Sequence, residues 1–159
     1  MNWFLFWLLL HIAAAIIAFG PIFVFPLMEP TVKARPGGLP FSALLSEKME
    51  RGLIVPVALT MLVSGFGMVI TLHLNFFANY WLLAAIVLYL AALAIAFLNQ
   101  MPVTGELVKL TENPGPPGPP SPEILALLQR NKIGGMIQTA MLIIIIFLMV
   151  IRPGGVVAG

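Results

Sequence analysis

Four apolar segments without any aspartate, glutamate, lysine or arginine dominate this sequence. They cover residues 3–27, 53–72, 80–98 and 133–151. Each is close to the ~20 residues that a helix needs to cross a bilayer core of about 30 Å. Because 60% of the 159 residues are hydrophobic and only 9% are charged, a water-soluble domain of this length could not bury the apolar surface. The sequence therefore predicts one transmembrane domain over residues 1–159, an all-α four-helix bundle integral to a membrane.

The lysines and arginines predict the orientation of the bundle. Seven of the eight lie in, or at the edges of, the two segments that join span one to span two and span three to span four. Only Arg152 follows the last span. Since cytoplasmic segments of membrane proteins are enriched in lysine and arginine, we expect both long connections in the cytoplasm and both termini outside.

The two cytoplasmic connections are predicted to contain two short helices and a proline-rich linker. Residues 41–51 and 122–131 are predicted to form two short helices on the cytoplasmic surface, the first of them amphipathic and lying at the membrane interface. Residues 112–122 are rich in proline, which is typical of an extended, polyproline-like linker. A docking site for a proline-reading partner is the alternative interpretation of this linker.

Small and weakly polar residues recur at spacings of three and four along the spans, which brings them to one side of each helix. Such residues let helix backbones approach closely, and hydroxyl groups can bond across the contact. The residues that we expect at helix–helix contacts are Thr60, Ser64, Gly67, Thr71, Ala85, Ala92, Gly135 and Gln138.

Few residues in the sequence are suited to catalysis. There is no cysteine, so neither a disulfide nor a thiolate metal site can form. Apart from His11, no span contains an ionisable side chain of the kind that marks ion paths and proton relays. Phosphate-binding loops, Ser-His-acid sets and metalloprotease motifs are absent, and the few basic residues do not form a nucleic-acid-binding patch. We therefore expect no enzymatic activity and no nucleic-acid partner.

His11 and His73 are the candidate cofactor ligands, because histidine binds haem iron and other metals. In an antiparallel pair of spans both would lie in the outer half of the bundle. His11 would lie about 12 Å deep and His73 near the surface, which argues against a shared iron. In the alternative interpretation, His11 forms a hydrogen bond across the bundle and His73 lies among the headgroups. A Cu(I) site at Met61 and Met68 is a further hypothesis, with gap-filling by flexible methionines as its alternative.

Several short motifs carry a resemblance that covers nearly the whole chain. They are Leu-Leu-His11 followed by alanines, the MERGLIVP run ending at Pro56, the SGFGM centre that begins at Ser64, and the LMVIRPG ending around Arg152. Together they resemble a bacterial family of small four-helix integral membrane proteins of unknown function. The resemblance implies the fold and a location in the bacterial inner (cytoplasmic) membrane.

More distantly, the chain is similar to membrane proteins of the copper-resistance D type and to the protoporphyrinogen-oxidase-like membrane family, which is associated with haem. Both carry a histidine in an early helix, which His11 matches. Two functional hypotheses follow. The first is a non-catalytic accessory or structural subunit of a larger membrane complex, or a homo-oligomer, with the lipid bilayer and other membrane subunits or itself as partners. The alternative is a haem- or metal-binding membrane protein that uses His11, with or without His73.

Overall fold

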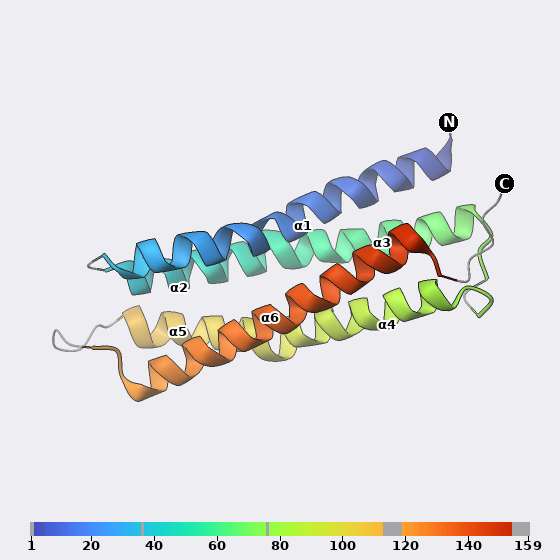
Figure 1. Ribbon diagram of the computed structural model, residues 1–159. Helices are drawn as coiled ribbons and strands as arrows, with labels where there is room; N and C mark the ends of the chain where they lie inside the picture. The colour runs from blue at the N-terminus through green and yellow to red at the C-terminus, as the bar shows by residue number, and fades with distance from the viewer. Residues whose placement is uncertain (1, 36, 76, 113–118, 154–159) are drawn as a thin grey trace.

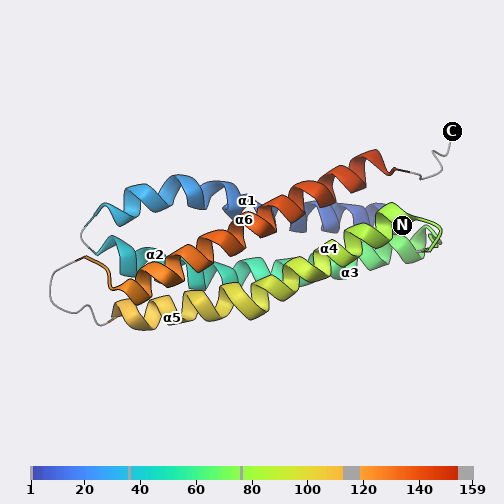
Figure 2. The ribbon, with the colours of Figure 1, turned by 60° about the horizontal axis from the view of Figure 1, so that its bottom comes forward.

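The computed structural model describes residues 2–35, 37–75, 77–112 and 119–153, and within them all regular structure is helical. The α-helices are α1 (Trp3–Lys33), α2 (Gly38–Met49), α3 (Val55–Thr71), α4 (Tyr80–Ile95), α5 (Met101–Glu112) and α6 (Pro122–Ile151). Two π-helical turns, η1 (Glu50–Ile54) and η2 (Ala96–Gln100), join α2 to α3 and α4 to α5 without a break (Figure 2). In this described part, four continuous helices are long and apolar enough to cross a membrane. The all-α four-helix prediction is confirmed.

The four continuous helices form two pairs. In the first pair α1 lies along α2, η1 and α3, and in the second pair α6 lies along α4, η2 and α5 (Figure 1). Helix α1 begins and helix α6 ends at the end of the bundle where α3 turns into α4 (Figure 1). We call this the terminal end. The opposite end, where α1 leads to α2 and α5 leads to α6, is the loop end.

Each π turn ends two residues before a proline, Pro56 or Pro102. A proline inside a helix has no N–H to donate, and its ring clashes with the carbonyl four residues earlier. The structure accommodates this with one wider turn, in which the N–H of Val55 donates to the carbonyl of Glu50 and that of Met101 donates to the carbonyl of Ala96. The helices therefore run through their prolines with backbone hydrogen bonds on both sides.

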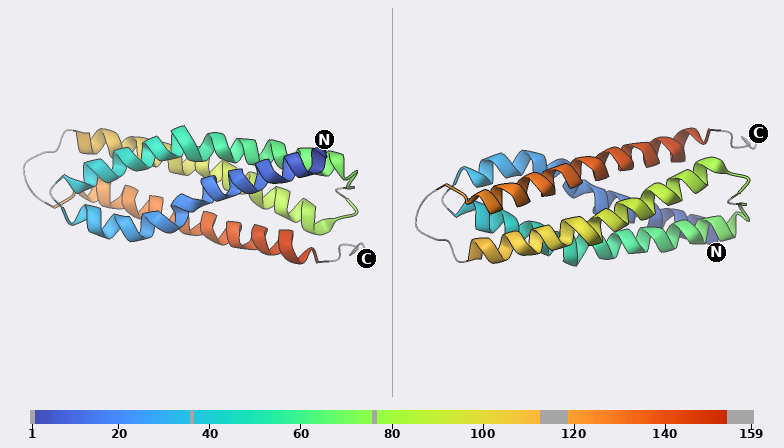
Figure 3. Two further views of the ribbon diagram at one scale, coloured as in Figure 1. Left: turned by 90° about the horizontal axis from the view of Figure 1, so that it is seen from above. Right: turned by 90° about the horizontal axis from the view of Figure 1, so that it is seen from below.

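Helix α1 accommodates its prolines without a π turn. It contains Pro21, Pro26 and Pro30, remains α-helical to Lys33, and bends near its middle (Figure 3). The helix is thus longer than the predicted span of residues 3–27. A bend is the usual response of an α-helix to an interior proline, because the lost hydrogen bond and the ring clash both act on one side.

The central core draws on all four continuous helices. Its buried members are Ala14, Ala58, Met61, Ala85, Tyr89 and Ile145. The hydroxyl of Tyr89 on α4 donates a hydrogen bond of 2.7 Å to the carbonyl of Ala58 on α3, which joins the two pairs at this level. A buried phenol needs such a partner, because an unpaired hydroxyl in an apolar core is costly.

A second core lies at the loop end, where the two short surface helices are predicted. Ala43 of α2 is buried against Val103, Leu107 and Val108 of α5, and the first turns of α6 pack on the same cluster. Residues 41–51 and 122–131 are helical as predicted, and they run into the spans as α2 with η1 and as the start of α6. Within residues 41–51, Ala43 is buried by this contact, whereas Phe41 and Leu44 remain exposed.

The continuous helices are longer than a bilayer core. The second and third are 34 and 33 residues long, or about 50 Å, against about 30 Å for the hydrocarbon. Counted from the terminal end, Arg51 and Gln100 each lie about 20 residues along their helices, which corresponds to about 30 Å. The two π turns therefore lie at the level where the apolar part of the bundle ends.

The proline-rich linker is only partly described. Residues 113–118 of the predicted linker lie outside the described residues. At its end, Ser121 caps α6 by accepting a hydrogen bond of 3.3 Å from the backbone N–H of Ile124, with Pro122 in the first turn. This cap is the one that the sequence indicates.

Helices α1 and α3 approach each other closely at Gly67. A Cβ atom on Gly67 would lie under 3.0 Å from three ring atoms of Trp7, whereas a Cβ atom on Gly20 of α1 would meet nothing within 4 Å. Gly67 is buried and Gly20 is exposed. The glycine at position 67 is therefore required by the approach of the indole ring and not by the backbone of its own helix.

We expect Gly67→Ala to lower the free energy of unfolding by about 1–3 kcal/mol, because the added methyl group overpacks the Trp7 contact. The measurement is reversible unfolding by SDS in mixed micelles, followed by circular dichroism. Gly52→Ala is the control, because a Cβ atom on Gly52 would also meet nothing within 4 Å, and it should leave stability unchanged or slightly raised, since alanine favours the helix. Equal losses in the two variants would contradict the packing argument.

Candidate functional site

The imidazole of His11 lies against α3 (Val55–Thr71). Its Nδ1 atom is 3.0 Å from the carbonyl oxygen of Met61 and 3.1 Å from Oγ of Ser64. Because a carbonyl can only accept, Nδ1 carries the hydrogen and donates it, and the unprotonated nitrogen of the neutral ring is Nε2. Ser64 is fully buried, and its hydroxyl also donates to Met61 O at 3.0 Å. Nε2 makes no hydrogen bond to another described residue.

His73 is placed quite differently. It lies two residues beyond the end of α3, has a φ angle of 52°, and is exposed. Ser64, the contact of His11, lies seven residues before the end of α3, which corresponds to about 10 Å along the helix. The structure thus places the two histidines at different levels of the bundle and does not bring them together.

The predicted packing residues have several different environments. Ser64 and Gly67 face α1, Ala85 is buried in the central core, and the hydroxyls of Thr60 and Thr71 donate to carbonyls of their own helix. On the second pair, Nε2 of Gln138 donates a hydrogen bond of 3.1 Å to the carbonyl of Ala92. A Cβ atom on Gly135 would lie 3.6 Å from Nε2 of Gln100, which is an ordinary contact.

The richest polar cluster lies between the two π turns, at the level where the apolar part of the bundle ends. We call it the polar joint. It consists of Glu47, Glu50, Arg51, Asn99, Gln100, Thr104, Arg130 and Gln138.

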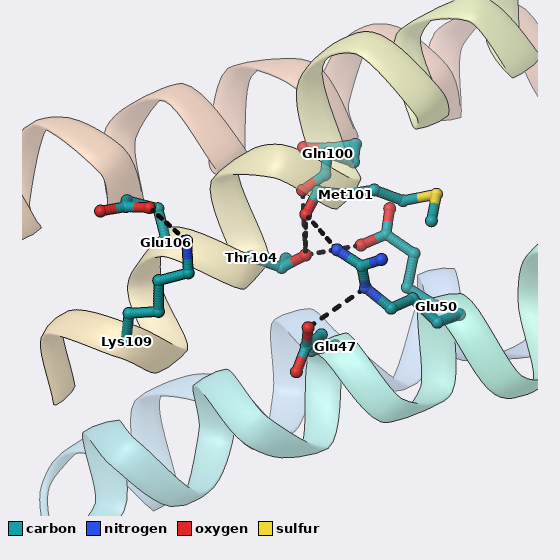
Figure 4. Close-up of polar contacts among 8 residues, drawn as sticks. Glu47, Glu50, Gln100, Met101, Thr104, Glu106 and Lys109 are labelled. Atoms are coloured by element: carbon teal, nitrogen blue, oxygen red, sulfur yellow. Dashed lines mark hydrogen bonds and ion pairs between the residues drawn. The ribbon is translucent and has the colours of Figure 1, made fainter. Parts of the chain in front are cut away.

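One side of the polar joint links the first pair to the second (Figure 4). Oγ1 of Thr104 lies 2.9 Å from Oε2 of Glu50, and it also lies 2.9 Å and 3.2 Å from the carbonyls of Gln100 and Met101. Arg51 donates to the carbonyl of Met101 at 3.3 Å. The single hydroxyl hydrogen of Thr104 serves only one of its three acceptors at a time. The link between the pairs is therefore polar, charged and closely packed.

Arg51 also forms an ion pair within its own helix, and a glycine of α5 lies opposite its guanidinium. Its Nε atom forms an ion pair of 3.1 Å with Oε1 of Glu47. A Cβ atom on Gly105 would lie 3.3 Å from the guanidinium. The small residue on α5 thus leaves room for the arginine side chain between the two pairs.

The other side of the polar joint lies within the second pair. Nε2 of Gln100 donates to Oε1 of Gln138 at 3.2 Å and to the carbonyl of Asn131 at 3.3 Å. Gln100 is buried, and a Cβ atom on Gly134 would collide with the amide of Asn99 and approach Gln100 to 3.1 Å. Gly134 therefore permits η2 and α6 to approach, and the two glutamines then satisfy each other.

Sequence reasoning missed most of the polar joint. Glu50 and Arg51 fall in a segment that the sequence predicts to lie at the surface, and no local pattern marks Thr104. One local signal was available: polar residues precede each proline within about two turns of helix, Glu50 and Arg51 before Pro56, and Asn99 and Gln100 before Pro102. An interior proline preceded by polar residues is consistent with a modified helical turn whose side chains are needed at a contact.

The chemistry open to these residues is limited by their pairing. In the described ranges, no group of three or more histidine and carboxylate side chains is placed to hold a metal ion. The carboxylates of Glu47 and Glu50 and the amides of Gln100 and Gln138 each contact a partner on another turn or helix. The arrangement is suited to holding the two pairs of helices in register.

We expect Thr104→Val to lower the free energy of unfolding by about 1 kcal/mol, because Glu50 loses its hydroxyl partner across the joint. Thr60→Val is the matched control, since Thr60 is exposed and bonds only to Pro56 O of its own helix. A double-mutant cycle with Glu50→Ala, measured by SDS unfolding, should give a coupling of about 0.5 kcal/mol or more. Additive losses would mean that the Glu50–Thr104 contact contributes nothing.

Comparison with known proteins gives a family and no closer relative. Searches of the curated proteins and of the solved structures found no match. A family model described as "Predicted integral membrane protein (DUF2269)" matches residues 5–153, which include all four membrane-length helices except the first residues of α1. The resemblance to a small four-helix membrane family of unknown function is confirmed, and the chain is an integral, multi-pass membrane protein that belongs to this family.

Proposed function

We propose that the protein is a non-catalytic, multi-pass protein of the bacterial inner membrane that acts as an accessory or structural subunit, either in a larger membrane complex or as a homo-oligomer. The observation that carries this proposal is the pairing of polar side chains across helices. Gln100 with Gln138, Glu50 with Thr104, and Tyr89 with the carbonyl of Ala58 all hold one helix against another. Side chains used in this way stabilise a scaffold.

The inner membrane and the orientation are part of the same proposal. The polypeptide would span as α-helices, whereas proteins of the bacterial outer membrane typically span as β-barrels. The basic residues gather toward the loop end, so the positive-inside rule supports a cytoplasmic loop end with both termini outside.

An exposed face of helix α1 is the surface that we propose for binding a protein partner. It packs on α3 and α2, and it leaves Ile16, Gly20 and Phe23 exposed in the middle of the helix. Gly20 has open space around it, and a glycine at this depth lets the backbone of another helix approach closely. A partner helix, from a second copy or another subunit, would then cover this face.

We expect the protein, extracted in a mild detergent, to run as a complex of more than one chain or with a stoichiometric partner in native mass spectrometry. Gly20→Leu should dissociate the complex, because the side chain blocks the close approach of a second backbone. Val150→Leu, at an exposed position near the end of α6, is the control and should leave the complex intact. A monomer without a partner, also after chemical cross-linking in intact membranes, would contradict the proposal.

A second candidate function, haem or metal binding, is favoured by the orientation of His11. A ligating histidine usually donates its other ring N–H to a carbonyl or carboxylate, which fixes the tautomer. The 3.0 Å bond from Nδ1 to Met61 O has this form and leaves Nε2 as the ligating atom. His11 would hold the haem or metal ion, and a bound haem would supply electron transfer. His73 is too exposed and too far along the chain from Ser64 to be a second ligand.

The absorption spectrum of the purified protein, oxidised and then reduced, separates the two candidates. Haem binding requires a reduced α-band of the b type that is lost in His11→Ala and kept in His73→Ala. The scaffold proposal expects a colourless protein with no stoichiometric metal by elemental analysis. Because Nδ1 also bonds to α3, His11→Ala is expected to lose about 1 kcal/mol of stability in either case, and His11→Asn is a second test variant that preserves a donor.

A further inference from the structure

A groove of about 500 Å³ runs along the surface of the second pair, between the end of α4 with η2 and the first half of α6. Its lining residues are Ile95, Asn99, Ala126, Gln129, Arg130, Ile133, Gly134 and Ile137. The groove is open along one side. We propose that it binds one anionic phospholipid, with the phosphate at Arg130 and an acyl chain along the isoleucines.

The polar lining residues lie toward the loop end of the groove, together with Ala126, and the isoleucines lie deeper. Helix α6 runs from the loop end to the terminal end, so Gln129 and Arg130 lie toward the loop end and Ile137 lies about 10 Å deeper. On the facing helix Asn99 lies toward the loop end and Ile95 lies deeper. A phospholipid has the same sequence of parts, a polar headgroup followed by an apolar chain.

Arg130 lies at the level of the headgroups. It is 21 residues from the end of α6, or about 31 Å, which is close to the thickness of the hydrocarbon core. From residue 133 to the end of the helix at Ile151 there is no charged residue. An arginine at this position lies where lipid phosphates are found and avoids the cost of a charge in hydrocarbon.

The guanidinium of Arg130 is held in place by the helix opposite. Its Nε atom donates a hydrogen bond of 2.6 Å to Oδ1 of Asn99, and the amide of Asn99 fits against Gly134. The two terminal nitrogens of Arg130 form no hydrogen bond or ion pair with another described residue. They are therefore available for the bidentate contact with phosphate that arginine favours.

The charge of the groove favours an anionic lipid over a zwitterionic one. Arg130 is the one charged residue among those that line it. The ammonium group of a phosphatidylethanolamine headgroup would find no carboxylate there, whereas an anionic phosphodiester matches the single positive charge. Ile133 and Ile137, each nearly half exposed, provide the apolar surface for the chain.

Native mass spectrometry of the detergent-purified full chain, titrated with dioleoyl phosphatidylglycerol, tests this site. We expect one lipid per chain, bound with a half-saturating concentration about fivefold lower than that of dioleoyl phosphatidylethanolamine. Arg130→Gln should raise the half-saturating concentration of phosphatidylglycerol about fivefold, which is the usual effect of one basic residue near an anionic surface. Inorganic phosphate at millimolar concentration should not displace the lipid.

Lys132→Gln is the matched control, because it removes the same charge from an exposed position two residues further along α6 that does not line the groove. It should bind as the wild type does. Equal losses in both variants, or equal binding of the two lipids, would show only a general layer of lipid around the protein and would overturn the site. Competition by inorganic phosphate would also overturn it, because the occupant would then be a free anion.

Two further variants keep the test decisive if Arg130→Gln does not fold. Ile137→Trp fills the apolar end of the groove without changing charge and should also weaken binding, whereas Ile146→Trp, exposed on the opposite side of α6, should not. Because the chain has no cysteine, Gln129→Cys reports on a protein occupant. Disulfide-linked dimers of this variant in oxidised membranes would mean that a second copy covers the groove, and the lipid proposal would be wrong.

Discussion

A proline in the interior of a helix leaves one carbonyl without its usual donor, and a bilayer supplies no water to replace that donor. The middle two continuous helices meet this constraint at Pro56 and Pro102 with a π turn before each proline. The wider turns lie opposite each other, as the contacts of Glu50 and Arg51 with the region around Met101 show. The polar joint is thus built where the backbone has to change its geometry. The register of the two helix pairs depends on it.

The sequence was sufficient for the four spans, because length and the absence of charge are local properties. It was insufficient for the loop end. Glu50 and Arg51 look like residues of an aqueous segment, yet they continue a helix because residues about 50 positions later in the chain supply their partners. Local periodicity cannot specify such a pairing. The amphipathic pattern around Ala43 predicts a helix with one apolar side, but it does not indicate whether Ala43 is covered by membrane or, as the structure has it, by α5.

In the first pair, too, residue spacing predicted which face of a helix makes contact, but not which distant residues it contacts. The recurrence of Ser64 and Gly67 predicted a face of α3, and that face does contact α1. The sequence could not indicate that Trp7 would fill the space above Gly67 or that His11 would bond to a backbone carbonyl. That one bond from Nδ1 is compatible with two roles, because it satisfies a polar ring in an apolar bundle and also presents Nε2 in the manner of a ligand.

The pairing of neighbouring helices bears on how the protein is made. All contacts between α1 and α3 fall within the first half of the chain, and the connection between α1 and α2 is only four residues long, residues 34–37. At ~5–20 residues per second, a ribosome needs roughly 5–15 s to complete the rest of the chain. A helical hairpin containing α1 and α3 can therefore insert and pack before α6 has been synthesised. Biogenesis can then proceed as two successive hairpins, and the contacts of Glu50 with Thr104 and of Arg51 with Met101 form only when the second hairpin arrives.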